Sequence, residues 1–432
     1  MILKINPVAT LQGELRPPSD KSLTHRAYMF AGLANGDCYV RMPLTGEDCE
    51  ATLRCMGQLG LGHEWIGVNE VRLVPMSEWR QPGSYLDCGN SGTTIRLLSG
   101  LLASRPLDCT LVGDASLSRR PMNRIAAPLR EMGANVEGDT PPLHIVGSQL
   151  QGIRYQSPVP SAQVKSCILL AGLGAEGVTR VTEPTLSRDH TERMLTAMGV
   201  ELDYPVPAMG EDAYSVELHG GQTGLRPFRL TVPSDISSAA FFLVAAAALP
   251  QGQLLVRDLL MNPSRTGLLD VLRQCGVPMD SGEDRSELGE PVADLEIRAP
   301  DSLRPFKIDA EVVPRLIDEI PALAVLATQC HGVTEIRGAA ELRVKESDRL
   351  EVMAEGLRAM GADIETYPDG LSISGPTCLN GTSIHARGDH RIAMSFAIAG
   401  LFAEGETIIE GAEAIDTSYP NFEVDLMRLS IV

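Results

Sequence analysis

The chain has 432 residues, more than one hydrophobic core usually organises, so two domains are predicted. Hydrophobic residues make up 44% of it, and no uncharged apolar run is long enough to span a membrane, which favours a soluble protein. A formal net charge of −19 argues against nucleic acid and membrane surfaces as partners. The 9 cysteines form no C-x-x-C pair, which predicts reduced thiols in a cytoplasm and neither disulfides nor zinc.

Six copies of one pattern follow along the chain, each a short polar cluster that runs directly into an apolar helix of small residues. The clusters start at Ser19, Asn90, Gln163, Ser234, Asp318 and Asp389, at intervals of 71, 73, 71, 84 and 71 residues. A fixed period of this kind indicates an architecture built from one supersecondary unit. Because a helix N-terminus attracts anions, we expect the polar clusters to converge on a small anionic substrate.

Each unit also contains an amphipathic helix that is followed by glycine and then by a strand. The glycines are Gly60, Gly133, Gly199, Gly276 and Gly361, at positions typical of helix C-caps. We therefore expect helix, strand, helix and two strands per unit, with the units stacked because one alone buries its helices poorly. The N-terminal 15 residues, which lack the apolar core of a signal peptide, are predicted to form a hairpin or two short strands.

The six units divide into two sets of three. PPSDKSLTHRAY, from Pro17, is echoed half a chain later by VPSDISSAAFF, from Val232. The sixth unit is cut short, and the N-terminal strand can complete it. We therefore predict one domain of residues 18–233 and a discontinuous one of residues 1–17 plus 234–432. The segment SGEDRSELGE, Ser281 to Glu290, is predicted to be a charged surface insertion.

The polar clusters of the first half contain residues that suit phosphate and carboxylate groups. SDKSLTHR (Ser19 to Arg26) offers Lys as a point charge and Arg as a fork, although helix capping with solvated charges is the alternative. CGNSGTTIR (Cys88 to Arg96) is a Gly-rich turn whose N–H groups can cradle phosphate, but it is not a P-loop. The other three motifs each have a structural interpretation when taken singly. GDASLSRRPM (Gly113 to Met122) is typical of a surface loop, SAQVKS (Ser161 to Ser166) of a capped helix start, and SRDHTER (Ser187 to Arg193) of a solvated helix face.

The clusters of the second half add carboxylates. IDEIP (Ile317 to Pro321) sets two at a helix start, where they stabilise the helix dipole or provide a general base. ELRVKESDR (Glu341 to Arg349) is densely charged, with exposed ion pairing as the alternative, and GDHR (Gly388 to Arg391) closes the set. The polar clusters recur at the same point of each repeat, which favours one shared site over independent surface charges. Metal clusters, nucleophile elbows and dinucleotide fingerprints are missing from the sequence, so we expect neither metal nor cofactor.

The motifs, taken in order, resemble those of the 5-enolpyruvylshikimate-3-phosphate (EPSP) synthase family over nearly the whole chain, and they are closer to its class II branch. They are SDKSLTHR, GNSGTTIR, SRRPM, SAQVKS, SRDHTE, ELRVKESDR and GDHRIAM. The resemblance implies an α/β (α+β) fold, a two-domain inside-out α/β barrel of the enolpyruvyl transferase type. It has six βαβαββ repeats, three per domain, and an active site in the cleft between the domains. The implied reaction moves the enolpyruvyl group of phosphoenolpyruvate to the 5-hydroxyl of shikimate 3-phosphate and releases phosphate. A cytoplasmic monomer is expected.

The resemblance also implies a role for each motif residue. Asp318 corresponds to the base for the 5-hydroxyl, and Glu346, with Lys21, to the group that protonates and deprotonates the methylene carbon. The residues expected to bind shikimate 3-phosphate are Lys21, Ser22, Arg26, Ser161, Ala162, Gln163, Ser187, Arg188, Asp318 and Lys345. Those expected to bind phosphoenolpyruvate are Lys21, Asn90, Gly92, Arg120, Gln163, Arg349 and Arg391.

Two departures and two alternatives accompany this resemblance. Ser418 stands where many members have Lys, which removes one expected contact to phosphoenolpyruvate, and Gly92 keeps the small residue associated with access of the inhibitor glyphosate. One alternative is the UDP-N-acetylglucosamine enolpyruvyl transferase family, which carries Cys before an Arg-Pro pair where GDASLSRRP has none. The other is a non-catalytic anion-binding relative, which is expected to lack Asp318 or Glu346.

Overall fold

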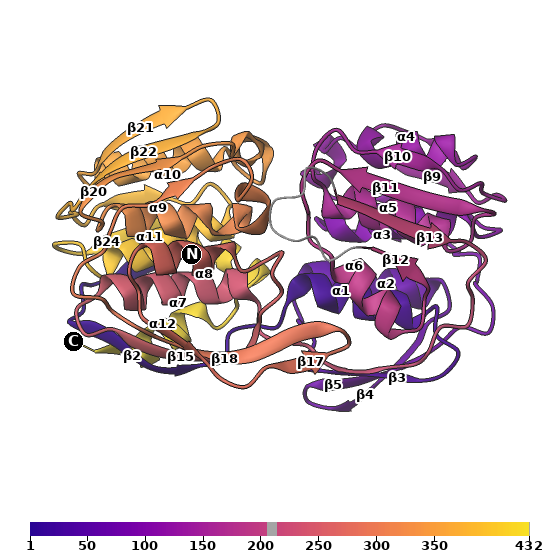
Figure 1. The fold of residues 1–432 in the computed structure, drawn as a ribbon, viewed down its shortest axis with the longest axis horizontal. Coiled ribbons are helices and arrows are strands. Elements are labelled where there is room, and N and C mark those ends of the chain that lie inside the picture. Colours follow the sequence, from indigo (N-terminus) through magenta and orange to yellow (C-terminus); the bar gives the residue numbers. More distant parts are fainter. Residues whose placement is uncertain (205–213, 432) are drawn as a thin grey trace. The chain divides into compact units, whose positions relative to one another are not determined.

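The computed structural model describes residues 1–204 and 214–431. These residues cluster into two compact units, whose elements are labelled in Figure 1. The N-terminal unit comprises Ser19–Val232 and Ser286–Glu290, and the C-terminal unit comprises Met1–Pro18, Pro233–Arg285 and Pro291–Val432. No helix in the described part of the chain is long and apolar enough to cross a membrane.

The N-terminal unit consists of three copies of a βαβαββ unit, each with a four-stranded sheet. The first sheet has the order β14-β3-β5-β4, the second β6-β7-β9-β8 and the third β10-β11-β13-β12. In every sheet the first two strands are parallel and the others antiparallel. The strands are β3 (Cys38–Arg41), β4 (Gly62–Gly67), β5 (Glu70–Val74), β6 (Leu86–Asp87), β7 (Asp108–Val112), β8 (Asn135–Glu137), β9 (Leu143–Val146), β10 (Arg154–Gln156), β11 (Val178–Glu183), β12 (Leu202–Asp203), β13 (Tyr214–His219) and β14 (Arg229–Thr231). The helices are α1 (Lys21–Ala31), α2 (Glu47–Gln58), α3 (Gly92–Ala103), α4 (Asn123–Glu131), α5 (Ala162–Gly172) and α6 (His190–Ala197).

The C-terminal unit repeats this plan in sheets ordered β16-β18-β15-β2-β25, β19-β20-β22-β21 and β1-β24-β23. Its strands are β1 (Ile2–Ile5), β2 (Thr10–Leu15), β15 (Gln253–Leu260), β16 (Met279–Ser281), β18 (Glu290–Arg298), β19 (Lys307–Ile308), β20 (Gly332–Ile336), β21 (Asp363–Tyr367), β22 (Gly370–Gly375), β23 (Ser383–His385), β24 (Thr407–Glu410) and β25 (Ser430–Ile431), and β17 (Arg285–Glu287) lies where the chain leaves the unit. Its helices are α7 (Ile236–Ala248), α8 (Gly267–Gln274), α9 (Ile320–Ala327), α10 (Arg349–Ala359), α11 (His390–Gly400) and α12 (Phe422–Leu429). The predicted two-domain α/β fold of βαβαββ repeats is therefore confirmed.

The N-terminal segment forms two short strands and not a hairpin, because β1 and β2 enter different sheets. β1 pairs antiparallel with β24, so Ile2 lies opposite Glu410 and Ile5 opposite Thr407. This pairing completes the shortened sixth repeat, as the sequence predicted. β2 runs parallel to β15 and supplies the first strand of the fourth repeat.

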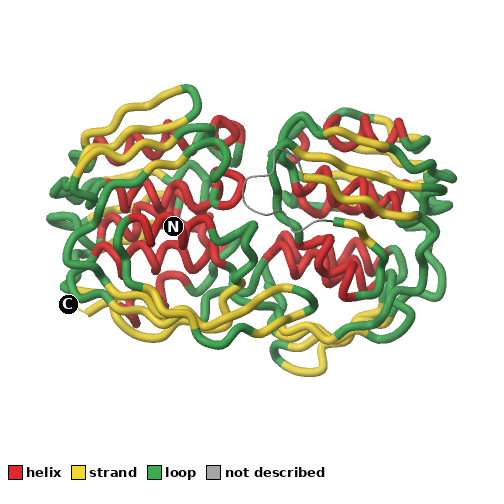
Figure 2. Tube along the Cα trace, viewed as in Figure 1, coloured by secondary structure: helices red, strands yellow, loops and turns green. Residues whose placement is uncertain are grey.

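The helices that follow the polar clusters form the interior of each unit, as the red segments inside yellow sheets show in Figure 2. α1, α3 and α5 belong to the N-terminal unit, where α3 contacts both others, and α7, α9 and α11 contact one another in the C-terminal unit. Every residue of α9 is buried, which agrees with its apolar sequence IPALAVLA. Small residues permit the close approach: a Cβ added to Gly100 of α3 meets the carbonyl oxygen of Cys167 in α5.

The predicted surface insertion, Ser281 to Glu290, is charged and mostly exposed, but the prediction is wrong for its last residue. The Glu290 side chain is buried within the N-terminal unit, where its Oε1 lies 2.7 Å from Nδ1 of the buried His190. Burial of a carboxylate without such a partner is unfavourable, and a sequence gives no sign of a partner 100 positions away.

Candidate active site

All six polar clusters lie at helix starts, where one side chain in most of them caps the helix. The side chains of Asp20, Ser91, Ser161, Asp235, Asp348 and Asp389 accept backbone N–H groups of α1, α3, α5, α7, α10 and α11. Capping was the alternative interpretation of several motifs, and it applies to these residues. It leaves neighbouring side chains, such as Lys21, Asn90 and Arg349, for other contacts.

A buried arginine organises the candidate site of the C-terminal unit. Arg349, the first residue of α10, is 2% exposed. Its Nε donates to Asp389 Oδ2 at 2.8 Å, and its Nη2 donates to Glu346 Oε2 at 2.7 Å. Its Nη1 reaches Asp318 Oδ1 at 3.4 Å. The two predicted catalytic carboxylates therefore share one guanidinium, although 28 positions separate them in the chain (318 to 346).

Arg391, the second predicted arginine of this unit, approaches Asp318 from α11. Its Nη1 donates to the carbonyl oxygen of Asp318 at 3.2 Å, and its Nε lies 4.0 Å from Asp318 Oδ1. Asp318 itself belongs to the short 3-10 helix Ile317–Glu319 that leads into α9. Lys345 is half-buried and directly precedes Glu346. The predicted residues of this unit thus surround one carboxylate with two cations.

The charges around Arg349 determine its protonation. Burial lowers the pKa of its guanidinium, but Glu346, Asp389 and Asp318 raise it, and the carboxylates prevail. Asp389 accepts its bond from Arg349 at the N-cap of α11 and also accepts the hydroxyl of Ser347 at 3.0 Å. Sequence analysis assigned Asp389 no role, although its position matches the capping Asp20 and Asp235 of other repeats.

In the N-terminal unit, Asn90, Gly92 and Arg120 lie together at the start of α3. Arg120 Nη2 donates to Asn90 Oδ1 at 2.6 Å. A Cβ added to Gly92 meets the guanidinium nitrogens of Arg96 at 2.8 Å and Arg120 at 3.4 Å. Arg96, which sequence analysis did not single out, donates to Gln163 Oε1 at 2.6 Å. Four predicted phosphoenolpyruvate residues, Asn90, Gly92, Arg120 and Gln163, therefore form a basic cluster together with Arg96.

Lys21 opens α1 and pairs with Asp48 Oδ2 at 3.0 Å. Burial raises the pKa of Asp48, but Lys21 lowers it and the net shift is downward. Burial lowers the pKa of the neighbouring His25 to about 3, so that imidazole is neutral at physiological pH. Lys21 therefore provides the positive charge at this helix start.

Arg26 reaches from α1 to two other helices. Its Nε donates to Thr191 Oγ1 at 2.8 Å and its Nη2 to Ser166 Oγ at 2.9 Å, while Nη1 returns to the carbonyl oxygen of Ser22 at 3.0 Å. Burial lowers the pKa of Arg26 to about 10, which still leaves it charged near neutral pH. Arg26 is 3% exposed, so little of its side chain is accessible for the predicted contact with substrate.

Ser161 and Ser187 are linked through the buried Glu183, which accepts the Ser161 N–H at 2.7 Å and the Ser187 hydroxyl at 2.7 Å on Oε2. Ala162 opens α5 directly after Ser161, and Arg188 is half-buried in the loop before α6. Sequence analysis missed Glu183 because it ends a strand outside every motif.

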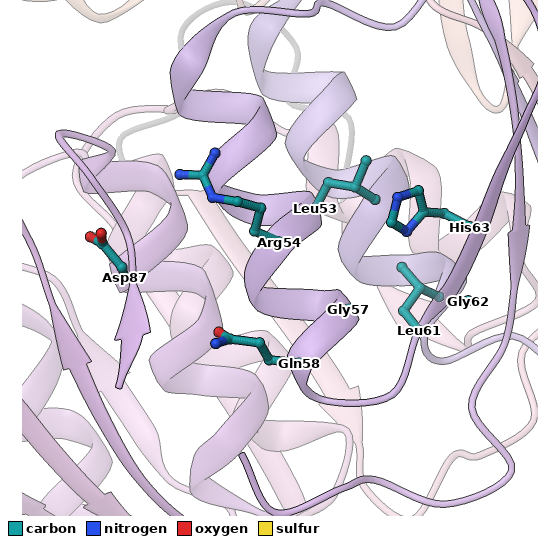
Figure 3. Close-up of a pocket in the computed structure, with 8 residues that line it drawn as sticks. All are labelled: Leu53, Arg54, Gly57, Gln58, Leu61, Gly62, His63 and Asp87. Carbon is teal, nitrogen blue, oxygen red and sulfur yellow. The ribbon is translucent and has the colours of Figure 1, made fainter. Parts of the chain in front are cut away.

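A hollow beside α2 holds none of the predicted site residues (Figure 3). Its lining consists of Leu53, Arg54, Gly57, Gln58, Leu61, Gly62, His63 and Asp87. The close-up shows Arg54 and Asp87 on different elements of this hollow. We base the candidate site on the side-chain clusters at the helix starts, because these combine charge, burial and hydrogen bonds, and not on this hollow.

Comparisons with known proteins show which family the chain resembles over its whole length. Residues 5–426 match the family model of EPSP synthase (3-phosphoshikimate 1-carboxyvinyltransferase). The 3-phosphoshikimate 1-carboxyvinyltransferase of Desulfitobacterium hafniense is 48% identical over 97% of this chain and 96% of the relative, and that of Brevibacillus brevis is 46% identical over 99% and 100%. The EPSP synthase structure from Acinetobacter baumannii has a TM-score of 0.89 at 43% identity, covering 100% of this chain and 98% of that one. The enolpyruvyl transferase NikO from Streptomyces tendae, at 18% identity and a TM-score of 0.77 over 99% and 97%, shares the fold.

Proposed function

We infer that these clusters carry out the chemistry of the EPSP synthase family, to which this chain belongs. The chain is a transferase that moves the enolpyruvyl group of phosphoenolpyruvate to the 5-hydroxyl of shikimate 3-phosphate and releases phosphate, a step of the shikimate pathway. We propose a role in this reaction for each side chain of the clusters. The observation that carries our assignment is the shared contact of Asp318 and Glu346 with the buried Arg349.

The proposed chemistry begins with protonation of the enol. Glu346 in its acid form, aided by Lys21, gives a proton to the methylene carbon of phosphoenolpyruvate, which makes the adjacent carbon electrophilic. The 5-hydroxyl oxygen bonds to that carbon while Asp318 takes its proton. Glu346, now a carboxylate, then takes a proton back from the new methyl group while the carbon–oxygen bond to phosphate breaks, which restores the carbon–carbon double bond and releases phosphate.

The cationic residues bind the two anionic substrates. We propose that Arg349 and Arg391 bind the carboxylate of phosphoenolpyruvate, since guanidinium forks match carboxylates, and that they stabilise charge in the tetrahedral intermediate. The remaining contacts to phosphoenolpyruvate are assigned to Lys21, Asn90, Gly92, Arg120 and Gln163. Those to shikimate 3-phosphate are assigned to Lys21, Ser22, Arg26, Ser161, Ala162, Gln163, Ser187, Arg188, Asp318 and Lys345. Both sets act on one substrate pair, because the reaction joins the two molecules.

The proposal extends to the setting of the enzyme. We propose that the enzyme is a cytoplasmic monomer. The reduced state of its 9 cysteines supports the cytoplasm, because thiols persist in a reducing compartment. The alternatives of a UDP-N-acetylglucosamine enolpyruvyl transferase and of a non-catalytic relative are disfavoured. The named relatives act on 3-phosphoshikimate, and this chain keeps both carboxylates.

Phosphate release by the purified protein tests the acceptor. With phosphoenolpyruvate and no added metal, we expect release with shikimate 3-phosphate and none above background with UDP-N-acetylglucosamine. Colorimetric phosphate detection measures both reactions under the same conditions. Release with UDP-N-acetylglucosamine alone contradicts the acceptor. Binding of shikimate 3-phosphate without any release contradicts catalysis and draws attention to Ser418, where many members have Lys.

Glyphosate is proposed to inhibit this enzyme, and Gly92→Ala is expected to weaken that inhibition. An added Cβ lies 2.8 Å from a guanidinium nitrogen of Arg96, which must shift, and 3.4 Å from one of Arg120, so the methyl group takes up space between the two arginines. We expect the inhibition constant for glyphosate and the KM for phosphoenolpyruvate to rise, the former at least about tenfold, a difference of about 1.4 kcal/mol. Initial rates at varied glyphosate measure this. Gly57→Ala serves as control, since a Cβ there meets nothing within 4 Å. Equal inhibition constants for wild type and Gly92→Ala refute the steric argument.

A further inference from the structure

One buried carboxylate joins two serines that belong to the shikimate 3-phosphate set. Glu183, the last residue of β11, accepts the backbone N–H of Ser161 at 2.7 Å on Oε1. It accepts the Ser187 hydroxyl on both oxygens, at 2.9 Å and 2.7 Å. Ser161 precedes α5 and Ser187 precedes α6, so Glu183 links the starts of two helices, which Ser166 and Thr191 also join by a hydrogen bond of 2.7 Å.

Lys165, on the first turn of α5, holds Glu183 in place. Its Nζ lies 2.9 Å from Glu183 Oε2 and 2.9 Å from Glu192 Oε1, and all three side chains have 0% exposure. The same Nζ donates to the carbonyl oxygen of Ser187 at 3.4 Å. Burial lowers the pKa of Lys165, but the two carboxylates raise it and prevail, so Lys165 stays an ammonium. A buried carboxylate is tolerated when it has such a charge partner and full hydrogen bonding.

The hydrogen bonds of Ser187 limit what it can offer a substrate. A serine hydroxyl carries one hydrogen, and here Ser187 directs it to Glu183. A phosphate dianion only accepts hydrogen bonds, so the hydroxyl must turn its hydrogen from Glu183 to the phosphate on binding. Lys165 and the Ser161 N–H remain on Glu183 after that turn and keep its charge compensated.

We propose that Glu183, held by Lys165, is a positioning residue that presets Ser161 and Ser187 for the phosphate of shikimate 3-phosphate. This inference rests on the proposed function, which assigns shikimate 3-phosphate as the ligand of Ser161 and Ser187. Preset donors bind a ligand more tightly since less ordering is lost on binding. Glu183 itself lies behind the serines and acts only through them.

The first test is Glu183→Gln, which keeps the shape of the side chain but replaces one acceptor oxygen by an amide donor and removes the charge opposite Lys165. We expect the KM and the Kd for shikimate 3-phosphate to rise about tenfold, the cost of one charge-assisted hydrogen bond. The KM for phosphoenolpyruvate and kcat should stay within about threefold, because lost ground-state binding raises KM alone. Phosphate-release kinetics with each substrate varied in turn give all three constants.

Glu192→Gln is the matched control. Glu192 is equally buried and pairs with the same Lys165, but in the described part of the chain it forms no hydrogen bond with Ser161 or Ser187. Its loss should lower the melting temperature as Glu183→Gln does, yet leave the KM for shikimate 3-phosphate within about threefold of wild type. An equal rise of that KM in both variants overturns the proposal, since the cluster then serves folding alone.

Glu183→Asp keeps the test decisive if Glu183→Gln does not fold. The shorter side chain retains the negative charge opposite Lys165 but cannot reach Ser161 and Ser187 together, so the KM for shikimate 3-phosphate should again rise. Wild-type KM in every folded Glu183 variant overturns this inference. An inactive wild-type enzyme, in contrast, contradicts the proposed function itself, so the two failures are distinct.

Discussion

Replacing Asp318 by Asn is expected to lower kcat by about 10²–10⁴-fold, the usual contribution of a general base. The amide keeps the size of the side chain but cannot take the proton of the 5-hydroxyl. Asp389 and Glu346 continue to hold Arg349, so the arginine should stay in place. Phosphate release under saturating substrates measures kcat, and calorimetry measures the binding of shikimate 3-phosphate, which should remain within about tenfold of wild type.

The neighbouring Glu319 provides the control for Asp318→Asn. Glu319 lies in the same short 3-10 helix, is 1% exposed and accepts the hydroxyl of Ser237. Glu319→Gln should therefore destabilise the fold more than it slows turnover. If Asp318→Asn keeps kcat within tenfold of wild type, or if Glu319→Gln causes the larger loss, Asp318 is not the base.

Glu346→Gln is expected to reduce kcat by about 10²–10⁴-fold as well, because no acid is then available to protonate the methylene carbon. In the structure Glu346 Oε2 lies 2.7 Å from Arg349 Nη2, and a carboxylate held in that ion pair cannot give a proton. The proposed role therefore requires the carboxylate of phosphoenolpyruvate to take over this nitrogen and to release Glu346. The KM for phosphoenolpyruvate should change little or fall, since Gln competes less strongly for Arg349.

Deuterium from solvent water gives a readout specific to Glu346. Reversible protonation of the methylene carbon places deuterium in recovered phosphoenolpyruvate, and Glu346→Gln should abolish this incorporation together with turnover. Glu351→Gln, on the first turn of the same helix α10 and 41% exposed, should change neither. Deuterium incorporation at the wild-type rate in Glu346→Gln would assign the proton transfer to another group, with Lys21 the first candidate.

Local sequence patterns correctly predicted that the polar clusters lie at helix starts. Capping residues such as Asp20 and Ser161 act within three or four positions, so the helix starts could be located from the sequence alone. Gly60, Gly133, Gly199, Gly276 and Gly361 all have positive φ angles, from 89° to 116°, as predicted for helix C-caps. The roles given to individual residues came from resemblance, and they remain to be tested.

No sequence pattern indicates the groups that hold these side chains in place. Glu183 lies between motifs, and its contacts with Ser161 and Lys165 span 22 and 18 positions (161 and 165 to 183). Arg26 reaches Thr191 across 165 positions, and Glu290 reaches His190 across 100. Sequence periodicity does not predict such pairs, because the sequence alone does not distinguish a buried charged residue from a solvated one.

The sequence by itself therefore determined the repeat, the helix and strand order and the chemical types at each helix start, since these depend on contacts within a few residues. Only the tertiary structure decided that Arg349 gathers Asp318, Glu346 and Asp389. Packing of segments 31 and 40 positions away creates the contacts of Arg349 with Asp318 and Asp389, whereas Glu346 is a near neighbour in the chain. A buried charge is stable only beside the partners that the fold supplies, so its partners could not be determined before the fold.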